Sequence, residues 1–417
     1  MARRALMVIP GMVALTLLLL FTAIARTSTS AQSTAPVAGL PIPDDCIAGQ
    51  QASGSDYLIC IPGAGQPDWN GDLLLYAHGY VPITEPVGIP ASQMFLPGPS
   101  GPVAVNDLVT DMGYGFATTS YPTNGLAVLP AIVDLIDLID LFTAEVTTPT
   151  RVLLTGVSEG GLIAALAIEQ HPDAFDGGMA LCGPYGGFHE QVDHFGDFRI
   201  VFDYFFPGLM PGDPVTVPTW LMDTWPTTYF SSTILPVIED PVNAPTITQL
   251  LSVTGAAPYE FDPPTSTRTI EKLLWYNVFA TEDAKIKLGG QPFDNTARVY
   301  SGSEDDDALN LGVTRIEADP AAIDEIEAFY QTSGDLRRPL VTLHTTGDFV
   351  VPYLHATLYQ AKVTRAGRDA LYQHFVTDVH GHCTFGALDV IEAFWALEEM
   401  LPQPIFLPLV MRAVAGD

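Results

Sequence analysis

Basic residues are scarce in this chain of 417 residues. Lysine and arginine together number 17, against 48 aspartates and glutamates, so the formal net charge is −31 at pH 7. A negative field of this size repels nucleic acids and anionic membrane surfaces, and it disfavours polyanionic substrates. The composition therefore predicts no nucleic-acid partner. It leaves neutral small-molecule or polymer substrates open, and it does not fix the oligomeric state.

Long apolar runs are also rare, and the one present lies at the N-terminus. Arg3 and Arg4 precede an apolar run that ends in the small residues of Ala23-Ile24-Ala25, and polar sequence follows. This order is typical of a secretory signal peptide, which we predict over residues 1–25, although the length of the run leaves an uncleaved membrane anchor open. Removal of two arginines would make the net charge −33. We expect a secreted, extracellular or periplasmic protein without stable membrane association after removal of the signal.

Cysteine is limited to four residues. In an exported chain four cysteines favour two disulfides, and three pairings are possible. We favour Cys46–Cys60, which closes a short loop ahead of the first strands, and Cys182–Cys383. The alternative is that the second pair remains as two free buried thiols.

Cofactor motifs are missing as well. The sequence contains no dinucleotide fingerprint and no phosphate-binding loop. Residues 189–194 resemble the zinc pattern H-E-x-x-H, but the second histidine comes one residue late, which turns the two imidazoles apart on a helix. We therefore expect no cofactor and no metal.

The most informative segment present spans residues 151–168. A β-branched and leucine-rich run is followed by Gly156-Val157-Ser158-Glu159-Gly160 and then by an apolar run, which predicts a strand, a sharp turn and a helix. This is the G-x-S-x-G pattern, in which Ser158 is presented as a nucleophile. Gly156 and Gly160 are expected where side chains would collide between strand and helix.

Two backbone amides are candidates for an oxyanion hole. The apolar strand predicted at Leu73–Ala77 is followed by His78-Gly79-Tyr80. We expect the N–H groups of Tyr80 and Glu159 to hold the developing oxyanion, with His78 and Gly79 shaping the turn.

The candidate acid and base lie far along the chain. Asp348 follows the strand predicted at residues 339–344, and His382 lies in the loop beyond the strand predicted at residues 371–377. We expect Asp348 to orient His382 and His382 to act as the base. His380 is the alternative base, and Asp378 is the alternative acid.

The chain order serine, aspartate, histidine resembles that of the α/β-hydrolase superfamily, in a secreted esterase/lipase-like or a prolyl-oligopeptidase-like branch. The His382-Cys383 pair is similar to secreted esterases of the feruloyl-esterase and tannase type, but these carry a second cysteine beside the nucleophile, where this chain has Val157. The resemblance implies an α/β fold, namely the α/β-hydrolase fold, with a mostly parallel central sheet, helices on both faces and an inserted cap.

The domain organisation that follows has five parts. They are a signal peptide (1–25), a flexible leader (26–43), a catalytic domain (44–183 and 338–401), a cap or lid insertion (184–337) and a C-terminal tail (402–417). Within the catalytic domain, residues 132–142 have helical spacing, and we expect Asp134, Asp137 and Asp140 to lie on a solvated helix face.

The predicted triad, together with the predicted signal peptide, favours an exported serine hydrolase that cleaves carboxylic esters through an acyl-enzyme intermediate. Two alternatives remain open at this stage. One is a peptidase or amidase with the same triad, and the other is a non-catalytic hydrolase-fold binding module.

Overall fold

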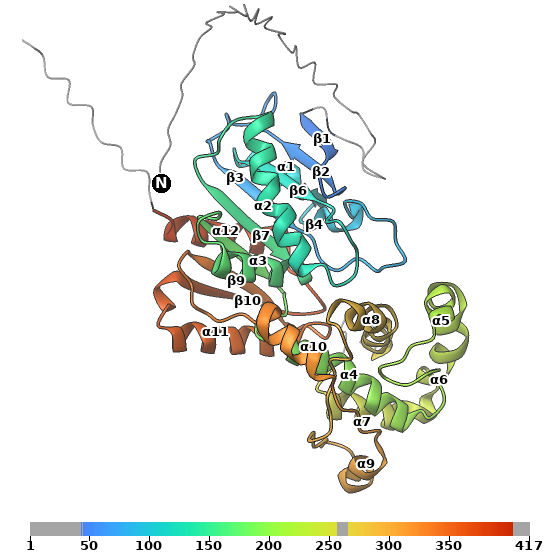
Figure 1. Cartoon of the computed structure of the whole chain (residues 1–417). Coiled ribbons are helices and arrows are strands. Elements are labelled where there is room, and N and C mark those ends of the chain that lie inside the picture. Colours follow the sequence, from blue (N-terminus) through green and yellow to red (C-terminus); the bar gives the residue numbers. More distant parts are fainter. Residues whose placement is uncertain (1–42, 44, 257–265, 403–417) are drawn as a thin grey trace, which may run out of the picture. The chain divides into compact units, whose positions relative to one another are not determined.

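The computed structural model describes residue 43, residues 45–256 and residues 266–402, all within one compact unit, Ala35–Asp417. At its centre lies a sheet of eight strands in the order β1-β2-β6-β3-β7-β8-β9-β10 (Figure 1). The strands are β1 (Cys46–Gln50), β2 (Asp56–Cys60), β3 (Leu73–Ala77), β6 (Gly115–Thr119), β7 (Val152–Val157), β8 (Gly177–Leu181), β9 (Leu340–Gly347) and β10 (Tyr372–His380).

Strand β2 pairs antiparallel with both β1 and β6, and the remaining pairs in this sheet are parallel. This mostly parallel sheet confirms the predicted α/β-hydrolase fold. A separate hairpin joins β4 (Phe95–Gly98) to β5 (Gly101–Ala104).

Helices cover both faces of the sheet. Those discussed below are α1 (Val105–Asp111), α2 (Val128–Glu145), α3 (Glu159–Gln170), α4 (Phe188–Phe205), α8 (Ser266–Lys287), α11 (Leu354–Ala366) and α12 (Ala387–Met400). The other helical segments are α5 (Thr219–Thr224), α6 (Leu235–Ile238), α7 (Ala244–Thr254), α9 (Asp306–Gly312), α10 (Pro320–Glu325), η1 (Ala91–Gln93), η2 (Trp225–Ile234), η3 (Pro241–Asn243), η4 (Ile326–Tyr330) and η5 (Asp369–Leu371).

The two faces of the sheet have separate cores. Leu73 and Leu75 of β3 pack in a cluster with α2, α3 and α11, whereas Leu74 and Tyr76 pack in a cluster with α1 and α12. Because both faces are covered, all five residues of β3 are buried. This explains why the strand is a continuous apolar run and does not alternate.

The segment between β8 and β9 is helical and contains its own apolar core. Its buried side chains include Phe198, Phe202, Trp225 and Leu273. The insertion thus stabilises itself by burying aromatic surface, while α4 and α8 also reach the site described below. The domain boundaries remain a prediction.

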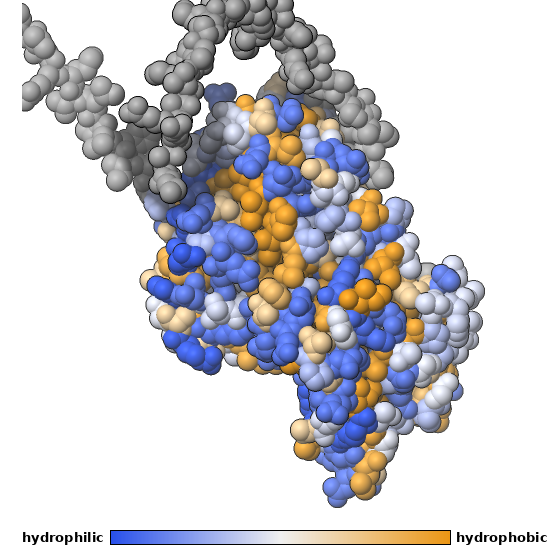
Figure 2. Space-filling view, viewed as in Figure 1, coloured by the Kyte–Doolittle hydropathy of each residue, from blue (hydrophilic) through white to orange (hydrophobic). Residues whose placement is uncertain are grey.

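One sequence prediction about α2 was wrong in part. Asp137 and Asp140 are exposed, but Asp134 is buried. Its carboxylate accepts hydrogen bonds from the hydroxyls of Ser53 (3.1 Å) and Ser55, which lie in the turn between β1 and β2. The helical spacing had identified the face correctly, but a turn from another part of the chain covers one end of it. Elsewhere on α2, apolar side chains gather at the surface (Figure 2), where Val133 is 66% exposed.

The predicted disulfide Cys46–Cys60 is present. The two residues face each other across the antiparallel pair β1–β2, so the bond closes a hairpin and not a loop ahead of the strands.

The predicted signal peptide, nearly all of the leader, and the tail beyond Pro402 lie outside the described residues. In the part of the chain that the structure describes, no helix has the length and apolar character needed to span a bilayer.

Candidate active site

Ser158 stands on the predicted turn between β7 and α3. Its backbone has φ 60° and ψ −121°, a conformation that L-residues rarely adopt and that sites of chemistry often hold. The neighbouring glycines are required by close approach. A Cβ on Gly156 would lie 1.8 Å from the carbonyl oxygen of Gly160, and a Cβ on Gly160 would lie 2.0 Å from that of Ala77. The glycines therefore let the strand and helix meet closely enough to expose the serine.

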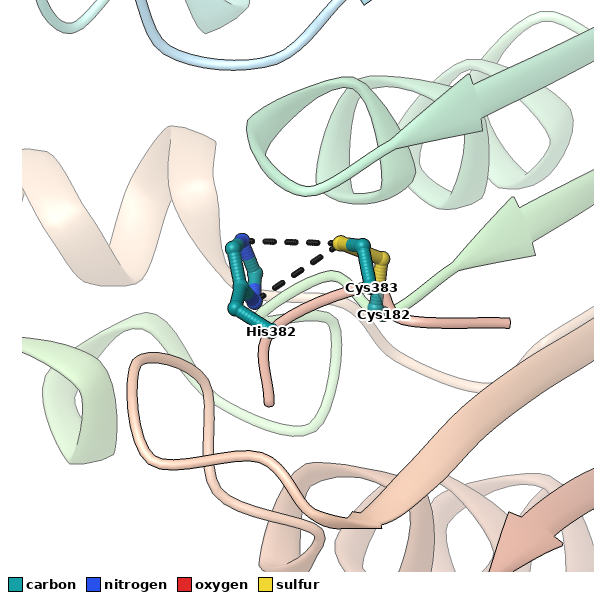
Figure 3. A group of neighbouring side chains, drawn as sticks. All are labelled: Cys182, His382 and Cys383. Carbon is teal, nitrogen blue, oxygen red and sulfur yellow. Dashed lines mark hydrogen bonds between the residues drawn. A yellow bond between two sulfur atoms is a disulfide. The ribbon is translucent and has the colours of Figure 1, made fainter. Parts of the chain in front are cut away.

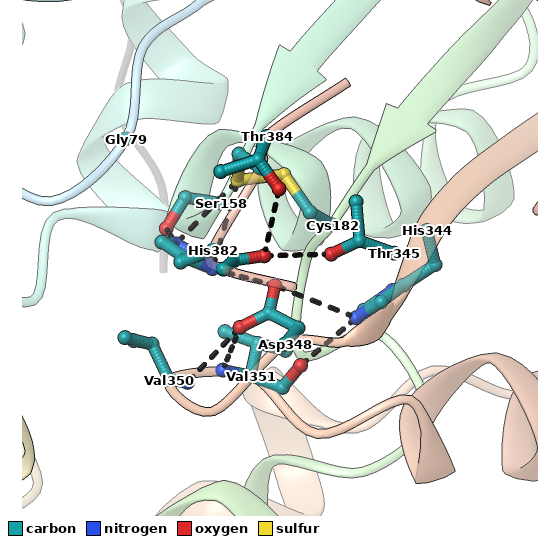
Figure 4. The surroundings of a disulfide bond; sticks show 12 residues. Gly79, Ser158, Cys182, His344, Thr345, Asp348, Val350, Val351, His382 and Thr384 are labelled. Atoms are coloured by element: carbon teal, nitrogen blue, oxygen red, sulfur yellow. Dashed lines mark hydrogen bonds and ion pairs between the residues drawn. A yellow bond between two sulfur atoms is a disulfide. The ribbon is translucent and has the colours of Figure 1, made fainter. Parts of the chain in front are cut away.

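The three side chains predicted to act together lie in one hydrogen-bonded row (Figure 4). The Oγ of Ser158 lies 2.8 Å from Nε2 of His382, and Nδ1 of His382 lies 2.8 Å from Oδ2 of Asp348. The alternatives lie elsewhere. His380 ends β10 beside Gly347, and the carboxylate of Asp378 accepts a hydrogen bond from the hydroxyl of Thr346.

The carboxylate of Asp348 is buried, and both of its oxygens have hydrogen-bond partners. Its Oδ1 accepts hydrogen bonds from the backbone N–H groups of Val350 (3.0 Å) and Val351 (2.9 Å), which leaves Oδ2 to face His382. Backbone donors of this kind fix the orientation of a carboxylate and stabilise its charged form.

A second histidine supports this loop and was not predicted. Nε2 of His344 lies 2.9 Å from the carbonyl oxygen of Val351, and Nδ1 lies 3.1 Å from the hydroxyl of Tyr185. A carbonyl only accepts, so Nε2 carries the proton, and the tyrosine donates to Nδ1. Burial lowers the pKa of His344, partly opposed by the charge of Asp348. His344 is therefore neutral, and its hydrogen bonds support the turn that carries Asp348.

The predicted oxyanion turn is held by a side chain that the sequence did not indicate. The N–H of Gly79 donates to Oε1 of Gln93 (2.6 Å), and Nε2 of Gln93 donates to the carbonyl of Tyr80 (3.1 Å). The side-chain amide of Gln93 thus binds the peptide groups on both sides of the one that contains the N–H of Tyr80. The second predicted donor, Glu159, is the first residue of α3, where N–H groups have no partner within the helix.

The contacts of the His78 ring indicate a structural role. Its ring stacks on Tyr121 with 3.9 Å between ring centroids, and its Nδ1 lies 2.8 Å from the carbonyl oxygen of Gly79. Burial lowers the pKa of His78 to about 4, so the ring is neutral near pH 7. It packs beneath the oxyanion turn.

The predicted disulfide Cys182–Cys383 is also present, with 5.5 Å between Cα atoms. It joins the residue after β8 to the neighbour of His382 (Figure 3), and Sγ of Cys383 lies 3.6 Å and 3.5 Å from the two ring nitrogens. Both cysteines have positive φ, 44° and 53°. The three residues are close enough to share a metal ion, but their sulfurs are oxidised and offer no thiolate.

Hydrogen bonds also hold the histidine loop to β9. The hydroxyl of Thr345 donates to the carbonyl of Gly381 (2.8 Å), whose N–H donates to the carbonyl of Gly347 (3.0 Å). The position of His382 therefore depends on β9 through hydrogen bonds and on β8 through the disulfide.

Beside Ser158 lies a pocket of about 110 Å³ with mostly apolar walls. It is lined by Tyr80, Leu126, Ser158, Glu159, Leu162, Pro184, Phe188, Gln191, Val192, Phe195, Tyr276, Ala280, Ala284, Val350 and Val351. The inserted segment supplies aromatic walls to this pocket, with Phe188 and Phe195 on α4 and Tyr276 on α8.

Three polar side chains in this pocket have a backbone partner, although Oε1 of Gln191 has none among the described residues. The hydroxyl of Tyr80 donates to the carbonyl of Phe279 in α8 (2.9 Å), and Nε2 of Gln191 donates to the carbonyl of Val350 (2.9 Å). Oε1 of Glu159 accepts from the N–H of Ala127 (2.8 Å). Burial raises the pKa of Glu159 to about 8, so its carboxyl is mainly neutral near pH 7.

Comparison with known proteins gives one family match. The model of the prolyl oligopeptidase family matches residues 110–186, the segment that contains the serine turn. No curated protein sequence matches the chain.

Solved structures resemble the chain only distantly. Est1E from Butyrivibrio proteoclasticus is 12% identical, with a TM-score of 0.39 over 85% of this chain and 97% of its own. The esterase Pf2001 from Pyrococcus furiosus is 12% identical, with a TM-score of 0.42 over 85% and 89%. An acylaminoacyl peptidase from Pyrococcus horikoshii is 11% identical, with a TM-score of 0.39 over 81% of this chain, which spans 37% of that peptidase. Values this low say nothing about the substrate.

The sheet order, the serine turn and the family match agree on the broad class. The chain has the α/β-hydrolase fold, and the segment that contains its serine turn is similar to the prolyl oligopeptidase family of serine hydrolases.

Proposed function

We propose that this protein is an exported serine hydrolase that cleaves carboxylic esters. Ser158 attacks the ester carbonyl while Nε2 of His382 takes the hydroxyl proton, and Asp348 holds the imidazole in the required tautomer. The amides of Tyr80 and Glu159 stabilise the oxyanion, and one such donor typically contributes ~10²–10³ in rate. The imidazolium then protonates the leaving alcohol. Water activated by the same histidine releases the acid.

The observation that carries the ester assignment is the apolar pocket beside Ser158. A peptide chain brings amide donors and acceptors that must find partners when buried. The hydroxyl of Tyr80, one carboxyl oxygen of Glu159 and the amide nitrogen of Gln191 are already bonded to this protein's own backbone, so Oε1 of Gln191 is the buried acceptor without a partner among the described lining residues. An apolar acyl chain needs no such partners, so the pocket favours an ester of an aliphatic or aromatic acid.

The peptidase alternative draws on the family match to residues 110–186. A peptidase that reads a free N-terminus would require ionised acids in the pocket. Glu159 is the acidic residue in this lining, and its raised pKa keeps it mainly neutral near pH 7. This environment favours the esterase over such a peptidase.

Export is supported by the two disulfides, which form in oxidising compartments. It also depends on the predicted signal peptide at residues 1–25. Mass spectrometry of the mature N-terminus of the secreted protein would test this directly, and a full-length cell-bound product would contradict it.

Labelling and paired substrates test the activity. A fluorophosphonate probe should label the wild type and not Ser158→Ala, with the two proteins giving the same circular dichroism spectrum. A p-nitrophenyl ester should then be cleaved faster than the p-nitroanilide of the same acid. Equal labelling of the variant would refute the nucleophile, no labelling of either protein would favour a binding module, and faster cleavage of the anilide would favour a peptidase.

A further inference from the structure

A second cavity, of about 300 Å³, adjoins the site on the histidine side. It is lined by Arg268, Lys272, Trp275, Tyr276, Phe349, Val350, His382 and Thr384. The apolar pocket contains Ser158 and not His382, whereas this cavity contains His382 and not Ser158. The two cavities share Tyr276 and Val350, so they adjoin each other, one at Ser158 and the other at His382.

The proposed reaction indicates which part of the substrate each cavity would bind. The leaving group must lie near Nε2 of His382, because that nitrogen gives it a proton. The acyl group must then occupy the apolar pocket beside Ser158. The cavity on the histidine side is therefore where a leaving group would lie.

One helix supplies the walls of both cavities. On α8, side chains three or four residues apart share a face. Arg268, Lys272, Trp275 and Tyr276 line the leaving-group side, and Tyr276, Ala280 and Ala284 line the acyl side. The face of α8 thus changes from cationic and aromatic to small and apolar along its length.

The charge of the leaving-group cavity opposes that of the chain. Among the described residues that line it, two of eight are cationic and none is acidic, although acidic residues outnumber basic ones by 48 to 17 overall. Several basic side chains elsewhere are paired with carboxylates. Arg298 contacts Asp193 and Asp197, for example.

The surroundings of Lys272 differ from those of such paired cations. Its ammonium lies 5.7 Å from the ring centroid of Trp275, and among the described residues no carboxylate forms an ion pair with it. A partly buried cation on an aromatic face, at a cavity whose described lining contains no acid, is suited to an anionic ligand.

We propose that the preferred substrates are esters whose leaving alcohol or phenol carries a negatively charged group, such as a carboxylate, recognised by Lys272. This deepens the proposed esterase function and depends on it. A carboxylate on the acyl side would instead enter the apolar pocket and be disfavoured.

Matched phenyl esters test the proposal. We would measure kcat/KM for 4-carboxyphenyl butyrate and for its neutral amide analogue, 4-carbamoylphenyl butyrate. A solvent-accessible ion pair contributes about 1 kcal/mol, which corresponds to about a fivefold preference for the charged ester at low ionic strength. The preference should shrink as salt is added. Monophenyl succinate, with its charge on the acyl side, should be a poorer substrate than phenyl butyrate.

Variants assign the preference to the cavity. Lys272→Gln should reduce the ratio of the two kcat/KM values toward one. Arg365→Gln removes the same charge from an exposed position on α11 and should leave the ratio unchanged. A wild-type ratio of one or less, or a ratio unaffected by Lys272→Gln, would overturn the proposal while leaving the esterase intact.

Two further outcomes separate this inference from the function on which it rests. If neither phenyl ester is cleaved, the esterase proposal itself fails. If the amide N-butyryl-4-aminobenzoate is cleaved faster than 4-carboxyphenyl butyrate, Lys272 binds the terminal carboxylate of a peptide, and the ester proposal is wrong.

Discussion

Removal of the disulfide Cys182–Cys383 should impair catalysis beyond its effect on stability. The bond joins residues 201 positions apart. In the chain-entropy model, closing a loop of this length stabilises the fold by about 5 kcal/mol, because it restricts the unfolded chain. Cys182→Ala/Cys383→Ala should therefore lose up to about that amount of unfolding free energy, measured by urea denaturation.

The effect on activity has a separate cause. The sulfur of Cys383 lies against the ring of His382, and both cysteines are held at positive φ. Without the bond, the two residues relax toward ordinary backbone conformations, and the imidazole moves from Ser158. Functional side chains must be held within about 0.5 Å of working geometry, so we expect kcat to fall by at least about tenfold at a temperature where the variant is folded.

The other disulfide provides a matched control. Cys46–Cys60 spans 14 positions at the far edge of the sheet and should contribute about 3 kcal/mol in the same model. Cys46→Ala/Cys60→Ala should thus lose stability but retain kcat. Full turnover in the variant lacking Cys182–Cys383, or an equal loss of kcat in the control, would refute the reasoning. Cys182→Gly/Cys383→Gly also removes the bond, but glycine tolerates positive φ. Comparison with the alanine variant therefore separates the effect of losing the bond from the effect of backbone strain.

Four further predictions concern single residues of the site. His382→Ala should abolish ester turnover, while His380→Ala should retain much of it; the opposite pattern of rates would identify His380 as the base. Asp348→Asn should lower kcat by about 10⁴ without unfolding, because the amide stabilises the wrong tautomer, and near-normal kcat would place the acid elsewhere. Gln93→Ala should lower kcat by about tenfold with little change in KM, because it loosens one oxyanion donor; a rise in KM at constant kcat would instead indicate a role in binding. Glu159 has a pKa raised from 4.5 to about 8 in the folded state, so its stabilising effect is full below pH 4.5 and is lost as the pH rises through 8. The unfolding free energy of the wild type, relative to Glu159→Gln, should therefore fall between pH 5 and pH 9 in urea titrations, and a difference independent of pH would contradict the assignment.

The local part of the site was predictable from the sequence because it depends on short-range rules. A strand, a G-x-S-x-G turn and an apolar helix are consecutive in the chain, so the geometry of Ser158 followed from residues 151–168 alone. The chain order serine, aspartate, histidine then identified Asp348 and His382 as candidates, because each follows a predicted strand.

Contacts between distant segments were not predictable in the same way. Gln93 reaches the oxyanion turn from a short 3-10 segment, and no periodic pattern marks it. Asp134 was assigned to solvent because helical spacing identifies a face but not the turn that covers it. The residues that line both cavities could not be predicted for a related reason. Most aromatic residues of the insertion pack in its own core, and their number does not indicate which ones face the site.

Helix α8 has a consequence for how the proposed substrate preference could change. Ser158, Asp348 and His382 all follow strands of the central sheet, whereas substitutions on one face of a 22-residue helix would alter both cavities. New substrate preferences could therefore be acquired, or engineered, without disturbing the chemical step. The constraint is the hydrogen bond from Tyr80 to the backbone of Phe279, which any replacement helix must preserve in register. Because that bond uses a carbonyl, it restricts the path of the helix and not the identity of its side chains.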